Sequence, residues 1–75
     1  MTKIRLKFEK ADQIINFVRI ISRYEYDADV KCGSRTVDAK SIVGVLSLAK
    51  SKTVELILHS ESCGDLLEAI ASYAA

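Results

Sequence analysis

The 75-residue chain contains no proline and no tryptophan, and only three glycines, two cysteines and one histidine. The two cysteines, Cys32 and Cys63, are too few for a disulfide scaffold and lack the grouping of a zinc site, so the sequence predicts a reduced, cytosolic protein without a metal. No uncharged run approaches the roughly 18 residues that a membrane span needs, and the alternating start of the chain is unlike a signal peptide. Most acid–base or phosphotransfer chemistry at neutral pH would have to use the one histidine, His59.

What the chain does contain is typical of one small globular domain spanning residues 1–75. Of its residues, 49% are apolar and 28% are charged, and the net charge is +1. A chain of this length buries roughly 60% of its unfolded surface, enough for a single two-layer core but not for a large enclosed pocket. Residues 1–40 carry nine basic and six acidic residues, and residues 41–75 carry two and four. This polarity is too mild to predict nucleic-acid binding.

Alternating hydrophobicity predicts four strands. Residues 3–8 and 53–59 alternate strictly, as half-buried strands do. Residues 27–39 are interpreted as a hairpin about a type II′ turn at Gly33-Ser34, because glycine suits the first central position of that turn. The predicted register pairs Val30 with Val37, Ala28 with Ala39, Lys31 with Thr36 and Asp29 with Asp38, the last pair bringing like charges together across the ladder.

Three segments are predicted to be helical. Apolar residues at helical spacing predict a helix from Ala11 to the region of Arg23–Glu25. Ser41 is a favoured N-cap for a short helix over residues 42–48, although that β-branched run with a glycine has poor helix propensity. A last helix is predicted over residues 62–74. In the resulting order β-α-β-β-α-β-α, strands with alternating faces require the helices to cover one face of the sheet and leave the other to water.

Residues 39–48 read Ala-Lys-Ser-Ile-Val-Gly-Val-Leu-Ser-Leu. This segment resembles the Lys-Ser-Ile-Met-Gly-Val-Met-Ser-Leu stretch of HPr, the phosphocarrier protein of the bacterial phosphoenolpyruvate-dependent sugar phosphotransferase system, and the order of elements is similar over essentially the whole chain. The resemblance implies an α+β fold, the HPr-like open-faced β-sandwich, with an antiparallel sheet of order 1-4-2-3 and three helices on one face. It implies a protein that is not an enzyme and that needs no cofactor.

The family's phosphoryl-accepting residue is a histidine in a His-x-Arg-Pro motif at the start of the first helix. It receives the group from Enzyme I and passes it to Enzyme II subunits. At that place this chain reads Lys10-Ala11-Asp12-Gln13, and no histidine precedes residue 59. The resemblance therefore predicts that the motif is lost at Lys10, Asp12 and Gln13. A protonated Lys10 amine is no nucleophile, and Asp12 stands where an arginine would hold phosphate.

The family's second site is a serine at the start of the second helix, which HPr kinase/phosphorylase phosphorylates in Gram-positive relatives. Ser41 matches this position, and a phosphate dianion at a helix N-terminus meets free amides. Ser41 is equally explained as an N-cap alone, and the two roles are compatible. Ile42, Val43 and Leu46 match the family's exposed docking patch, although such residues also occur in cores. The pattern of a kept serine and a missing histidine is similar to that of catabolite-repression HPr.

These observations favour a regulatory or protein-interaction module that is phosphorylated on Ser41. Its expected partners are proteins such as HPr kinase, a transcriptional regulator or transport components, with no nucleic acid and no membrane. One alternative is an active phosphocarrier that uses His59 as an atypical acceptor. His59 is expected on the outer face of the last strand as a solvated residue, with no partner spaced for a triad or a metal site. Another alternative is a structural or oligomeric module, since the sequence leaves the oligomeric state open.

Overall fold

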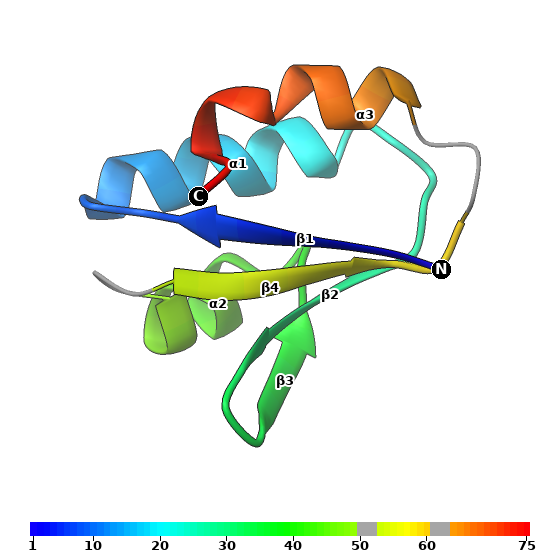
Figure 1. Cartoon of the computed structure of the whole chain (residues 1–75). Helices are drawn as coiled ribbons and strands as arrows, with labels where there is room; N and C mark the ends of the chain where they lie inside the picture. The colour runs from blue at the N-terminus through cyan, green and yellow to red at the C-terminus, as the bar shows by residue number, and fades with distance from the viewer. Residues whose placement is uncertain (50–52, 61–63) are drawn as a thin grey trace.

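The computed structural model describes residues 1–49, 53–60 and 64–75, and these contain one antiparallel four-stranded sheet (Figure 1). Its strands stand in the order β1-β4-β2-β3, which confirms the predicted topology. β4 is thus a central strand, and its first residue pairs with the last residue of β1. The strands are β1 (Thr2–Lys7), β2 (Ala28–Cys32), β3 (Arg35–Asp38) and β4 (Thr53–Leu58).

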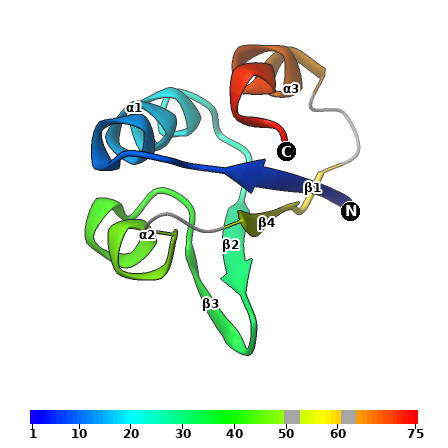
Figure 2. The same ribbon diagram turned by 60° about the vertical axis from the view of Figure 1, so that its left-hand side comes forward.

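The helices cover one face of this sheet, as Figures 1 and 2 show together. They are α1 (Ala11–Ile21), α2 (Ile42–Ala49) and α3 (Gly64–Ala69), with a 3₁₀ turn, η1, at Ala71–Tyr73. α1 and α3 lie side by side, and α2 packs beside α1 against β2 and β3. The fold is therefore the predicted open-faced β-sandwich. In the described part of the chain, no helix has the length and apolar character needed to cross a bilayer.

The first helix is shorter than predicted, because α1 ends at Ile21 and not near Arg23–Glu25. Beyond it, the N–H groups of Arg23 and Tyr24 donate to carbonyls three residues back, at 3.1 and 3.2 Å. This is the 3₁₀ pattern that often closes an α-helix. Tyr24 still packs against the core, which explains why the apolar stripe continues past the end of the helix.

The predicted helix over residues 62–74 is two elements, and its first two residues lie outside the described ranges. The helical conformation breaks at Ile70, where φ is −109° and ψ is 7°. The break turns the chain back toward the sheet, where Ala74 forms an antiparallel bridge with Leu6. The N–H of Ala75 also donates to the carbonyl of Arg5, at 3.0 Å, so the last residues occupy part of the β1 edge. The pairing with β1 therefore ends the helix earlier than the spacing of its apolar residues predicts.

The hairpin has the predicted register. Gly33 has a φ of +63°, in the region that a primed turn requires and that glycine adopts without strain. The predicted pairs of Val30 with Val37, Lys31 with Thr36 and Asp29 with Asp38 are all present, and Ala39 donates its N–H to Ala28 O. The register leaves two carboxylates opposed on the open face of the sheet.

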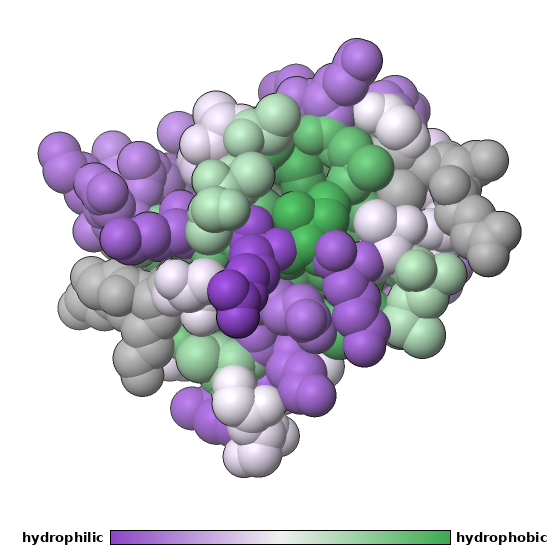
Figure 3. Space-filling model, in the orientation of Figure 1, coloured by the Kyte–Doolittle hydropathy of each residue, from purple (hydrophilic) through white to green (hydrophobic). Residues whose placement is uncertain are grey.

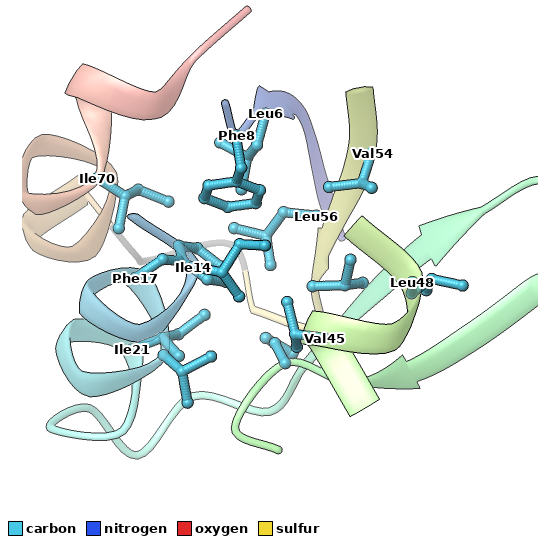
Figure 4. Packing of buried hydrophobic residues seen from close by; sticks show 14 of the residues in the cluster. Leu6, Phe8, Ile14, Phe17, Ile21, Val45, Leu48, Val54, Leu56 and Ile70 are labelled. Atoms are coloured by element: carbon cyan, nitrogen blue, oxygen red, sulfur yellow. The ribbon is translucent and has the colours of Figure 1, made fainter. Parts of the chain in front are cut away.

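The core lies between the sheet and the three helices, and its side chains point toward one another in Figure 4. β4 is its centre, because Val54, Leu56 and Leu58 are all buried beneath the helices. An aromatic group closes one end, with the Phe8 ring centroid 5.2 Å from that of Phe17 and 5.6 Å from that of Tyr73. The buried residues are Leu6, Phe8, Ile14, Phe17, Val18, Ile21, Ala28, Val30, Ala39, Val45, Leu48, Val54, Leu56, Leu58, Leu66 and Ile70.

Apolar side chains also reach the surface of the molecule away from the open face of the sheet. Figure 3 shows hydrophobic surface where α3 meets β1, next to hydrophilic side chains. β1 and α3 each supply a partly buried apolar residue that packs against the core from outside, Ile4 and Leu67. Scattered apolar exposure of this kind is ordinary in a small domain, whose polar surface cannot cover all of its core.

The central position of β4 predicts a large difference between its two faces. Replacing the fully buried Leu56 by alanine should lower the free energy of unfolding by about 2–5 kcal/mol, through lost transfer energy and the remaining cavity. Replacing its outward neighbour Glu55 by glutamine, which keeps the side-chain length and removes only the charge between Arg5 and Lys31, should lower that energy by less than about 1 kcal/mol. Urea denaturation of both variants measures the difference. Equal effects would contradict the described orientation of β4.

Candidate functional site

Ser41 caps α2, as predicted, and its position is set by the end of β3. The backbone N–H of Ser41 donates to the carbonyl of Asp38 at 3.0 Å, and the N–H of Lys40 donates to the Asp38 side chain at 2.9 Å. The Ser41 hydroxyl oxygen accepts from the N–H of Gly44 at 3.2 Å, and the Ser41 carbonyl accepts from Val45 at 2.9 Å. The exposed Ser41 hydroxyl is therefore held at the first turn of α2.

Lys40 ties this turn to the end of α1. Its ammonium group donates to the carbonyl of Tyr24 at 2.8 Å. The Tyr24 ring stacks on that of Tyr26, with centroids 6.0 Å apart and an interplanar angle of 14°, and the Tyr26 hydroxyl donates to Asp65 in α3 at 2.9 Å. The hydrogen bond from Lys40 to Tyr24, here called the Lys40 brace, holds the start of α2 near the carboxyl end of α1. These contacts join segments far apart in the sequence, so the local sequence pattern does not predict them.

The predicted docking patch is only partly a surface patch. Val43 is 79% exposed and Ile42 is 40% exposed, whereas Leu46 is half-buried and packs against the outside of the core. Val45 and Leu48 are the buried, inward residues of α2. The exposed apolar surface of α2 therefore lies on its first turn, directly beside Ser41.

The amino end of α1 carries Lys10, Asp12 and Gln13, the residues at the predicted lost motif. Lys10 and Asp12 are exposed, and Asp12 lies in the first turn, where its negative charge complements the helix dipole. The Gln13 side-chain oxygen accepts from the backbone N–H groups of Glu9 at 2.7 Å and Lys10 at 3.3 Å. Gln13 thus satisfies the amides that precede the helix, and the segment offers no imidazole, thiol or hydroxyl.

His59 is exposed, as predicted, but it has a partner that the sequence analysis missed. Its Nε2 lies 2.9 Å from Oδ2 of Asp29, and the two side chains are 42% and 38% exposed. Asp29 also faces Asp38 across the hairpin. A shallow groove of about 210 Å³ beside His59 is lined by Asp27, Asp29 and Asp38, with Lys40 at its edge. The one sequence signal for this contact is the pair of opposed aspartates in the predicted register, because two carboxylates side by side favour a hydrogen-bond donor beside them.

His59 and the amino end of α1 lie at opposite ends of β4. β1 leads into α1 from Lys7, which pairs with Thr53, whereas His59 follows Leu58 at the other end of the strand. Six residues of strand span about 20 Å. In the described ranges, no group of three or more histidine, cysteine or acidic side chains is arranged to hold a metal ion. Cys32 is a free, half-buried thiol, and Cys63 lies outside these ranges.

Comparison with known proteins places this geometry in a family. A model of the HPr component phosphorylation site of the phosphotransferase system matches residues 9–75. A search of curated proteins gave no significant match. Because the family model matches most of the chain, the protein belongs to the HPr family of the phosphotransferase system.

Solved structures agree with this membership. The phosphocarrier protein HPr from Bacillus anthracis is 26% identical, with a TM-score of 0.76 over 99% of this chain and 96% of that one. The catabolite repression protein Crh of Bacillus subtilis is 31% identical, with a TM-score of 0.67 over 97% of this chain and 85% of that one. Crh is described as an intertwined, domain-swapped dimer. An HPr of Thermoanaerobacter tengcongensis, 22% identical with a TM-score of 0.78 over 96% and 89% of the two chains, shares the fold.

The cap at Ser41 is tested by three serine variants. Ser41→Ala should lower the free energy of unfolding by about 0.5–2 kcal/mol, because the Gly44 N–H loses its acceptor. Ser41→Asp should keep the free energy of unfolding near that of the wild type, because aspartate is also a favoured N-cap. Ser47 is the matched control, since its hydroxyl only donates to the Gly44 carbonyl from within α2. Chemical denaturation should show a loss below about 0.5 kcal/mol for Ser47→Ala. A Ser41→Ala loss no larger than that would contradict the capping role.

Proposed function

We propose that this HPr-family protein is a regulatory interaction module that does not carry phosphate on a histidine. One observation supports this most strongly: the segment Lys10–Gln13 at the amino end of α1 holds no phosphoryl acceptor, and the Gln13 side chain occupies the neighbouring amides. The protein acts as a binding partner and phosphate acceptor in the cytoplasm, without catalysing a reaction itself. Its partners are proteins, namely HPr kinase, a transcriptional regulator or transport components.

His59 is a poor substitute acceptor, although its exposed side chain makes it the second candidate. A phosphoryl group there would add negative charge to a groove already lined by Asp27, Asp29 and Asp38. Lys40 also lines that groove, but one proton of its ammonium group is held by the Tyr24 carbonyl, and a single lysine does not offset three carboxylates. Like charges at this range disfavour the phosphorylated form.

Ser41 is the acceptor that the family kinase modifies. Its hydroxyl is exposed, and a phosphate on it lies against the first-turn amides and the positive end of the α2 dipole. The exposed side chains of Ile42 and Val43 stand beside it, so a protein that binds this apolar surface also contacts the modified serine. Phosphorylation then changes the charge of the docking surface itself. Self-association is the alternative use of this surface, and it differs from the dimer of Crh, which is formed by domain swapping.

The modification is tested by incubating the chain with HPr kinase/phosphorylase and ATP and mapping phosphate by mass spectrometry. We expect one phosphate, on Ser41, in the wild type and in Ser47→Ala, and none in Ser41→Ala. HPr labelled in parallel shows that the kinase is active. An unlabelled wild type beside labelled HPr would reject the proposal for Ser41.

The docking role of α2 is tested on the same reaction. Val43→Glu places a charge on the most exposed apolar side chain of α2, so it should raise the KM for the kinase about tenfold, the effect of losing a contact worth ~1.4 kcal/mol. Thr36→Glu, on the exposed outer face of β3, is the control and should leave KM unchanged. The thermal midpoint of both variants should stay near that of the wild type. An unchanged KM for Val43→Glu would exclude this surface as the docking site.

Self-association is tested by light scattering on the wild type and on Val43→Glu, because Val43 is exposed whereas Leu46 packs against the core. A dimeric wild type that becomes monomeric in Val43→Glu would support self-association through α2, and a monomeric wild type would reject it.

A further inference from the structure

Gly44 stands in the first turn of α2 at a position where its backbone does not require glycine. Its φ is not positive, since Gly33 is the one positive-φ glycine in the described residues. Glycine within a helix costs about 0.5–1 kcal/mol relative to alanine. The reason for a glycine here must therefore lie in the space around it.

That space is narrow and is bounded by Ser41 on one side and β3 on the other. A Cβ atom at residue 44 would lie 3.2 Å from the Ser41 hydroxyl oxygen and 3.3 Å from Val37 Cβ. The second distance is shorter than the 3.5–4.0 Å of an optimal carbon–carbon contact. Val37 is paired with Val30 in the sheet, so β3 yields less readily than the Ser41 side chain, which turns about one bond. A methyl group at residue 44 would therefore displace the Ser41 hydroxyl or lift α2 from β3.

Gly44 also fixes the Ser41 hydroxyl through its N–H, which donates to Oγ at 3.2 Å. This bond uses one lone pair of the oxygen and leaves the hydroxyl proton available to a base. We infer that Gly44 is a positioning residue for phosphoryl transfer to Ser41: its N–H fixes Oγ, and because it carries no side chain it leaves that oxygen undisplaced. The inference rests on the proposed phosphorylation of Ser41.

In the reaction, Ser41 Oγ forms a bond to the γ-phosphorus of ATP while the bond from that phosphorus to the β–γ bridging oxygen breaks. ADP leaves with the electron pair, and the hydroxyl proton passes to a base of the kinase. In the product, the phosphate oxygens replace Oγ as acceptors of the Gly44 N–H. A methyl group at residue 44 would crowd the attacking oxygen.

The test compares Gly44→Ala with Gly64→Ala in the kinase reaction. Gly64 is the matched control, because a Cβ there meets nothing within 4 Å. A nucleophile displaced by about 1 Å loses up to ~100-fold in rate, and relief of the 3.2 Å contact moves Oγ by only part of that distance, so Gly44→Ala should lower kcat by about 3- to 10-fold with KM nearly unchanged. Gly64→Ala should match the wild type in both constants. If Gly44 had only a structural role, Gly44→Ala would lower the thermal midpoint without lowering kcat selectively. An unchanged kcat in a folded Gly44→Ala variant would overturn the inference.

A second measurement needs neither a variant at residue 44 nor the kinase. Phosphoserine is introduced at residue 41 during translation, and the amide resonances of the three glycines are compared with those of the unmodified chain by NMR. The Gly44 amide proton should move downfield as it binds the phosphate, while those of Gly33 and Gly64 stay in place. An unmoved Gly44 resonance would overturn the inference. Failure of the wild type to be labelled by the kinase would instead reject the proposed function and leave this result intact.

Discussion

The single apolar face of the central strand β4 is the constraint on which the rest of this structure depends. Leu56 and its neighbours on that face are buried, and they can be covered only if every helix lies on the same side of the sheet. Antiparallel pairing with β1 and β2 then fixes where each connection leaves the sheet. α1 begins at one end of β4, and α2 begins beyond the hairpin, where Lys40 fastens it to the end of α1. The amino ends of the two helices are thus separate sites.

In the proposed function, this separation allows the Ser41 site to be kept while the amino end of α1 changes. Ser41 depends on the Asp38 turn, the Lys40 brace and the Gly44 amide, none of which involves the amino end of α1. Gln13 closes the amides before α1 locally, so α1 needs no ligand there to be stable. In this proposal the chain keeps the α2 surface of an HPr protein and uses it for regulation.

Much of the fold could be predicted because its determinants are local. Alternation defined the faces of β1 and β4, Gly33 defined the hairpin register, and Ser41 defined the start of α2. The ends of α1 and of the last helix could not be predicted, because each depends on a tertiary contact. Tyr24 packs against the core although it lies beyond the end of α1, and Ala74 lies outside the last helix because it pairs with Leu6. At the site, the contact of His59 with Asp29 and the hydrogen bond from Lys40 to Tyr24 join residues far apart in the chain, and periodicity carries no information about such contacts.

The central claim is that this protein, although it belongs to the HPr family, does not accept a phosphoryl group on a histidine. It is tested most directly by incubating the chain with phosphoenolpyruvate and Enzyme I and analysing the intact protein by mass spectrometry under alkaline conditions, which preserve phosphohistidine. HPr in the same mixture serves as the positive control. We expect HPr to gain phosphate and this chain to gain none. A phosphorylated chain that loses its label on replacement of His59 by alanine would contradict the claim.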